Sequence, residues 1–153
     1  MNPVKESEIT MASVEKFSVG AVRNQLRHNR REIEHSGNPD IDPSRQGQDY
    51  VLSPDRGMTE YDYFLQRKSE LYCYNRDDIK VMAGWVVTAP QDLDPERFDD
   101  FFCATYDFLA NRYGEENVVQ AIVHDDEGGQ PHLHFCFVPV VEDPKHEQGY
   151  KIC

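Results

Sequence analysis

The sequence predicts an α+β domain with a central antiparallel β-sheet and flanking helices, and three observations support this. Segments with strand-like and helix-like patterns follow one another in the order β-α-loop-α-β-α-β-β. The last two strand-like segments, 117–126 and 131–140, are joined by a turn too short for a crossover helix, so they should pair as an antiparallel hairpin. A chain of 153 residues suits a single core. We expect the helices to pack on one face of the sheet.

The first elements lie in the N-terminal third. Residues 9–17 alternate apolar and polar side chains, which is typical of a strand. Residues 19–35 have apolar side chains near helical spacing and arginines at other positions, which indicates an amphipathic helix. Residues 36–57 are rich in Gly, Pro, Asp and Ser and predict a long irregular segment of a kind that is often functional.

Two elements are expected in the middle of the chain. Residues 59–75 read as a second helix, with Thr59 as the N-cap. Residues 79–90 form an apolar run that ends at Pro90, which predicts a buried strand.

The third helix has signals at both ends. Residues 94–114 begin with Asp94 as an N-cap and Pro95 at the first helical position, and they end at Gly114. The two strands of the predicted hairpin follow this helix and complete the expected sheet.

Composition narrows the classes of function. The net charge of −12 argues against a generic nucleic-acid binder, which is usually basic. The stretch "RNQLRHNRR" nevertheless gathers four arginines within residues 23–31, and such a local patch can still hold a phosphate backbone. No apolar run is long enough to span a bilayer, and the N-terminus lacks a signal-peptide pattern. An intracellular protein is therefore the expectation.

Three of the six histidines lie in the stretch "HDDEGGQPHLHFCFVP", residues 124–139. Side chains alternate along a strand, so His132 and His134 share one face. His124 ends the preceding strand, and the hairpin can bring it beside them. A His-x-His pair alone is more often a polar strand face than a ligand pair, but a third histidine favours a metal site with open positions. Asp125 is interpreted as part of a solvated turn.

This stretch resembles the third motif of the Mob/Pre plasmid mobilisation and recombination relaxases, within the His-hydrophobic-His endonuclease class. The matching residues are His124, Asp126, Glu127, Pro131, His132, His134 and Pro139. One departure is a turn between Glu127 and Pro131 that is a residue longer than the family pattern.

Two upstream motifs extend the resemblance to roughly residues 10–140. "HNRR" at 28–31 is similar to the first family motif, and "NPDIDPSRQGQDYVL" at 38–52 is similar to the second. Asp49 stands where the family usually has Asn. The resemblance implies that residues 1–153 form a single relaxase nuclease domain that lacks a further C-terminal region.

The resemblance also implies a reaction. A relaxase of this type nicks one DNA strand at a plasmid transfer origin and stays attached to the 5′-phosphate. It would use Mn²⁺ or Mg²⁺ held by His124, His132 and His134. The implied nucleophile is His28, with Glu127 as the acceptor that orients its ring. Tyr50 is the alternative nucleophile.

Further expectations concern the partner. We expect single-stranded or hairpin origin DNA, gripped by Arg27, Arg31 and Arg45 through phosphate contacts. Asn29 either contacts DNA or caps a local turn, and Arg30 either joins the basic face or is a solvated charge. The expected compartment is the bacterial cytoplasm.

Two alternatives stay open at this point. The chain could be a small three-histidine metalloenzyme that does not act on DNA, in which case "HNRR" should lie far from the metal. It could also be a catalytically inactive module that binds origin DNA, which would suit its acidic net charge.

Overall fold

The computed structural model describes residues 12–30, 49–74, 76–125, 129–142 and 150–152. In chain order the elements are β1 (Ala12–Ser18), α2 (Val19–Asn29), β2 (Tyr50–Val51), α3 (Glu60–Ser69), β3 (Lys80–Thr88), the 3₁₀ turn η2 (Pro95–Arg97), α4 (Phe98–Tyr113), the 3₁₀ turn η3 (Glu115–Asn117), β4 (Val118–His124), β5 (His132–Phe137), β6 (Val140–Glu142) and β7 (Tyr150–Ile152). Among these helices, none has the length and apolar character needed to cross a membrane.

The central sheet has five strands in the order β1-β3-β5-β4-β2, and every neighbouring pair is antiparallel. The predicted fold class and the predicted β4–β5 hairpin are therefore confirmed. The hairpin register opposes His124 to His132 and Ile122 to His134. The two-residue strand β2 and the small β6–β7 sheet were not predicted from the sequence.

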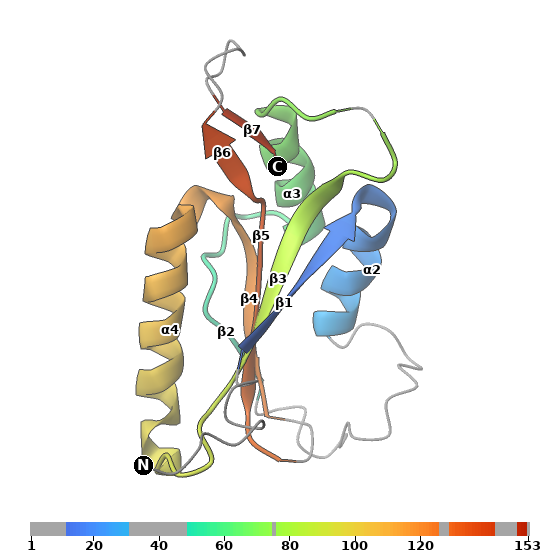
Figure 1. Ribbon diagram of the computed structural model, residues 1–153. Coiled ribbons are helices and arrows are strands. Elements are labelled where there is room, and N and C mark those ends of the chain that lie inside the picture. The colour runs from blue at the N-terminus through green and yellow to red at the C-terminus, as the bar shows by residue number, and fades with distance from the viewer. Residues whose placement is uncertain (1–11, 31–48, 75, 126–128, 143–149, 153) are drawn as a thin grey trace, which may run out of the picture.

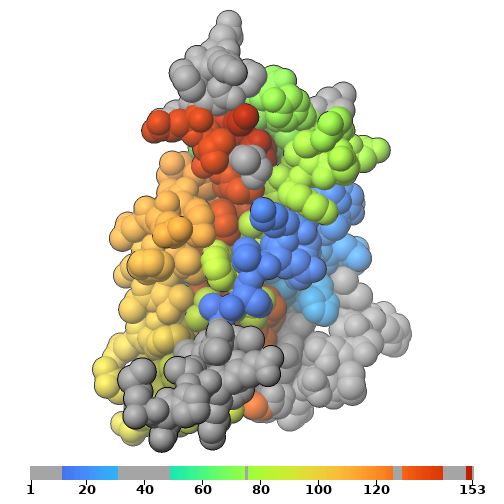
Figure 2. All heavy atoms as spheres, viewed as in Figure 1, coloured from blue at the N-terminus to red at the C-terminus, as the bar shows by residue number. Residues whose placement is uncertain are grey.

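Helices cover both faces of the sheet, so the expectation of a single covered face is wrong. Helix α4 lies along one face, and α2 and α3 lie on the other (Figure 1). The reason is that β4 is buried along its whole length, so both of its faces need a covering layer. Figure 2 shows α4, in yellow to orange, forming one side of the molecule, with the blue strand β1 at the surface beside it.

Helix ends agree with most of the capping signals. The Thr59 side chain accepts a hydrogen bond from the backbone N–H of Asp62, and Gly114 ends α4 with φ of 92°. Asp94 caps η2, which leads into α4.

One helix boundary was predicted wrongly, because the helix expected over 59–75 ends at Ser69. Tyr72 instead pairs with Lys151, and its carbonyl accepts a hydrogen bond of 2.9 Å from the N–H of Ile152. This pairing joins segments that are far apart in sequence, so no local sequence pattern predicts it. Helix α2 ends at Asn29, and the rest of the helix expected over 19–35 lies mostly outside the described residues.

Candidate metal centre

The structure brings the three histidines of the hairpin together on the sheet face that α2 covers. His132 and His134 point to the same face of β5, and the register adds His124 from β4. One ring nitrogen from each residue lies within 4.8 Å of the others. The ring centroids of His124 and His134 are 4.4 Å apart, and those of His132 and His134 are 4.9 Å apart. Three imidazole nitrogens therefore converge at one point.

His124 is the most deeply buried member, with 0 % of its surface exposed. Its Nε2 lies 2.5 Å from the backbone carbonyl oxygen of Asn29. A carbonyl can only accept a hydrogen bond, so Nε2 is the donor in this contact. Metal-binding histidines are commonly held this way, with the second ring nitrogen donating to a carbonyl. A set of three imidazole side chains thus fits a divalent transition metal.

The end of helix α2 lies against this cluster. Asn29 is the last residue of α2, and its carbonyl makes the contact to His124. His28, the predicted nucleophile, directly precedes it in the same helical turn and is half-buried. The first family motif and the three histidines are therefore neighbours in space, although nearly a hundred positions separate them in sequence.

Asn29 is itself buried, with 1 % of its surface exposed. Its Nδ2 donates to Oε1 of Gln120 at 2.9 Å and approaches the sulfur of Cys136 at 3.5 Å. Its Oδ1 accepts a hydrogen bond of 3.0 Å from Gln25. This placement does not support the predicted DNA contact of Asn29, because its amide group is used inside the protein.

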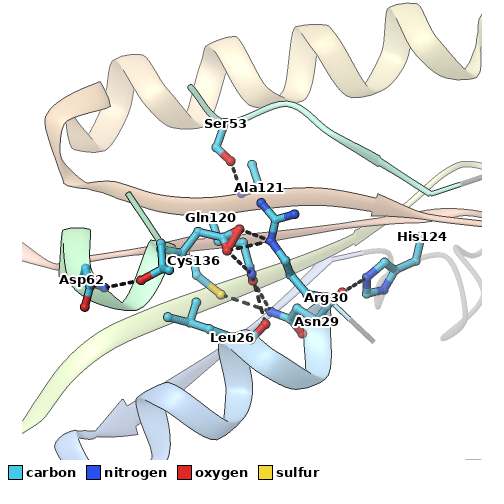
Figure 3. Close-up of polar contacts among 11 residues, drawn as sticks. Leu26, Asn29, Arg30, Ser53, Asp62, Gln120, Ala121, His124 and Cys136 are labelled. Atoms are coloured by element: carbon cyan, nitrogen blue, oxygen red, sulfur yellow. Dashed lines mark hydrogen bonds and ion pairs between the residues drawn. The ribbon is translucent and has the colours of Figure 1, made fainter. Parts of the chain in front are cut away.

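Gln120 is a site residue that the sequence interpretation missed. It is completely buried, and its Nε2 donates to the carbonyl of Leu26 and to the carboxylate of Glu60, both at 3.1 Å (Figure 3). A signal was present in the sequence. Gln120 is the one amide in the apolar run "VVQAIVH", and it has the same strand parity as His124.

The predicted DNA-binding arginines are only partly within the described residues. Arg27 is exposed on α2. Arg30 is also exposed, and its Nε binds both oxygens of Glu60 at 2.5 and 2.8 Å. These arginines and Arg23 line a groove of about 540 Å³ between α2 and α3. Arg31, Arg45 and Glu127 lie outside the described residues.

Tyr50, the alternative nucleophile, is not brought to the histidine cluster. It pairs with Val123 and packs with the core under α4, on the opposite face of the sheet. Its hydroxyl donates a hydrogen bond of 2.7 Å to Asp99. Burial, and then this carboxylate, raise the pKa of Tyr50 well above its ordinary value. A phenol that holds its proton this firmly is a poor nucleophile near neutral pH.

The residue before Tyr50 does reach the hairpin. Oδ1 of Asp49 accepts a hydrogen bond of 2.9 Å from the backbone N–H of Asp125, which directly follows His124. The end of the second family motif is therefore fastened next to the histidine cluster. Asp49 is also the position at which this chain departs from the usual family residue.

A five-stranded antiparallel sheet with helices on both faces and three histidines on one hairpin defines a relaxase-type domain. The solved structures support this class. The chain is similar to the Mn-bound crystal structure of the MobM relaxase domain bound to plasmid pMV158 oriT DNA. That match has a TM-score of 0.74 and 31 % identity, and it covers 93 % of this chain and 72 % of that one. A second Mn-bound crystal structure of that domain with oriT DNA matches with a TM-score of 0.71 and 29 % identity.

The chain belongs to the plasmid recombination enzyme family, Mob_Pre, whose model matches residues 6–151. This confirms the predicted resemblance. A plasmid recombination enzyme of Streptococcus agalactiae is 31 % identical over 138 residues, covering 84 % of this chain and 28 % of that protein. The type 1 enzyme of Staphylococcus aureus is 36 % identical over 124 residues, covering 76 % of this chain and 30 % of that protein. The chain thus spans about a third of the length of these relatives.

Proposed function

We propose that this chain cuts one strand of origin-of-transfer DNA and becomes covalently joined to the 5′-phosphate through His28. The observation that carries the proposal is the contact between the Asn29 carbonyl and His124 at 2.5 Å. This contact joins the helix end that holds His28 to the three-histidine cluster. A nucleophile and a cation site within one neighbourhood are what phosphoryl transfer needs.

His124, His132 and His134 would hold the cation, which supplies positive charge to the phosphate oxygens when bound. Imidazole ligands favour Mn²⁺ over Mg²⁺. The similar MobM relaxase domain has a Mn-bound crystal structure, which supports Mn²⁺ as a candidate ion. We therefore propose Mn²⁺ as the better ligand and Mg²⁺ as a weaker substitute.

In the proposed step, a neutral ring nitrogen of His28 attacks the phosphorus of the scissile phosphodiester. A P–N bond forms, and the bond from phosphorus to the 3′-oxygen breaks. The other ring nitrogen gives up its proton, and the departing 3′-oxygen takes up one, so the product is a 3′-hydroxyl and a phosphoramidate. Glu127 is proposed as the acceptor that keeps the attacking nitrogen unprotonated. The step is reversible, because one phosphoryl linkage replaces another.

The proposed partner is single-stranded or hairpin origin DNA. Arg27 is exposed one residue before His28, which suits a contact to a neighbouring phosphate. Arg31 and Arg45 are proposed for the same role from the family motifs. Arg30 is partly neutralised by Glu60, so its share of the phosphate grip should be smaller.

The position of "HNRR" counts against a three-histidine enzyme that does not act on DNA. That alternative requires the motif to lie far from the metal, whereas Asn29 touches His124. A DNA-binding module without catalysis remains a competing outcome, and the following experiment separates it from the proposal.

The protein is incubated with Mn²⁺ and a labelled single-stranded origin oligonucleotide, and covalent adduct is measured by denaturing electrophoresis. A longer family member serves as the positive control, and chelator serves as the negative control. We expect an adduct that hydrolyses in acid, as a phosphoramidate should. An acid-stable adduct would point to tyrosine instead. Binding without any adduct, while the longer relative reacts, would leave only the inactive module.

A further inference from the structure

We propose that Asn29 and Gln120 act as a clamp that positions both His28 and His124, so that they are positioning residues for the metal centre. This inference rests on the proposed function and extends it to two residues with no assigned role. From the sequence, Asn29 is expected either to contact DNA or to cap a local turn, whereas its burial and hydrogen bonds support this positioning role.

The clamp fastens the end of α2 to β4 at two points. The Asn29 side chain binds Gln120, and the Asn29 carbonyl binds His124. Gln120 and His124 are four residues apart on one strand and therefore face the same side. Asn29 thus binds two positions of the strand. These two contacts fix both the distance of the helix end from β4 and its rotation about the helix axis.

The amide groups in the clamp are fully used, so each bond depends on the others. Gln120 accepts from Asn29 with Oε1 and donates with Nε2 to the Leu26 carbonyl, near the end of α2. Its second donation reaches Glu60 of α3, which in turn binds Arg30 (Figure 3). Such a network is rigid when complete, and loss of one member leaves buried polar groups without partners.

The clamp has a consequence for the metal centre. The contact between Nε2 of His124 and the Asn29 carbonyl fixes the orientation of a ring that supplies one nitrogen to the three-histidine cluster. Groups that orient metal ligands in this manner typically change metal affinity or activity by about 10- to 100-fold when they are removed. We therefore expect the clamp to affect cation binding even when no DNA is present.

The test measures Mn²⁺ affinity of the whole chain by electron paramagnetic resonance, without DNA. Asn29→Ala and Gln120→Met should each weaken Mn²⁺ binding by about 10-fold. The double variant should also lose about 10-fold rather than about 100-fold, because both changes open the same clamp. Matched controls are Asn111→Ala on α4 and Gln66→Met on α3, two exposed positions where we expect wild-type affinity.

Adduct formation at saturating Mn²⁺ gives a second readout. Both clamp variants should form adduct at least about 10-fold more slowly than the wild type, with unchanged affinity for the oligonucleotide. If Asn29→Ala does not fold, Gln120→Met carries the same test, because Met nearly preserves the volume of Gln.

Wild-type Mn²⁺ affinity in the clamp variants, or fully additive losses in the double variant, would overturn the clamp. Failure of the proposed function has a different signature. In that case the wild-type chain binds Mn²⁺ and shows the clamp effect, yet it forms no adduct with any origin oligonucleotide.

Discussion

The two faces of strand β5 differ sharply in chemistry. Leu133, Phe135 and Phe137 point to the α4 side, where they join an apolar core. His132 and His134 point to the α2 side, close to buried Gln120 and Asn29. The single strand β5 therefore supplies hydrophobic stability on one face and candidate chemistry on the other. The comparison teaches that changes on the two faces should have separable effects, and four predictions test this separation.

The largest expected effect is a loss of adduct formation, and it concerns the α2 side of the sheet. His28→Ala should reduce adduct formation by about 10³-fold or more, since it removes the proposed nucleophile. The measurement is the rate of adduct formation with a labelled oligonucleotide. Tyr50→Phe, on the α4 side, is the control and should react at the wild-type rate. A His28→Ala protein that still forms adduct would remove His28 from this role.

The next effect concerns the α4 side. Phe102 is completely buried in α4, and Phe102→Ala should lower the free energy of unfolding by about 3–5 kcal/mol through lost burial and a cavity. Urea denaturation measures this loss. The folded fraction should bind Mn²⁺ with wild-type affinity, and a large change in that affinity would show that the two faces are not independent.

A third variant removes a proposed metal ligand. His134→Ala should weaken Mn²⁺ binding by about 100-fold, at the upper end of what orienting groups alone cost. In thermal melts, Mn²⁺ at 100 times the wild-type dissociation constant should stabilise the wild type by about 2.7 kcal/mol and the variant by much less. Equal stabilisation of both proteins by Mn²⁺ would place the ion elsewhere.

The smallest expected effect is a pH dependence of the folding stability, which arises on the face of the sheet that α4 covers. Burial, and then the nearby Glu115 carboxylate, raise the pKa of Tyr106 to about 12. The unfolded chain loses this proton near the ordinary tyrosine pKa of 10.0, whereas the folded chain keeps it. The contribution of protonated Tyr106 to the free energy of unfolding is therefore fully present below pH 10. This contribution is lost as the pH rises toward 12.

Tyr106→Phe should flatten this alkaline loss, as measured by denaturation midpoints between pH 9 and 11.5. Tyr50, whose pKa is also raised, should retain part of the slope in the variant. An unchanged slope would mean that Tyr106 ionises alike in both states.

Much of the site could be predicted because its determinants are local. Alternation along β5 set the shared face of His132 and His134, and the short turn brought His124 beside them. The end of α3 at Ser69 could not be predicted in this way, since it depends on the pairing of Tyr72 with Lys151. The second covered face also escaped prediction, because element order alone does not say on which side a helix packs. The role of Gln120 needed knowledge of its partner Asn29, 91 positions away.

The strand order has a consequence for how the protein reaches this state. In the five-stranded sheet, only the pairing of β4 with β5 joins strands that are consecutive in the chain, while β1 meets β3 across more than sixty residues. Short loops close with the smallest entropic cost, so the hairpin should form early and the β1 edge late. The three histidines sit within residues 124–134 of this hairpin. During folding, the hairpin would therefore bring the three histidine side chains together first. Docking of α2 onto the sheet would be the late event that completes the centre.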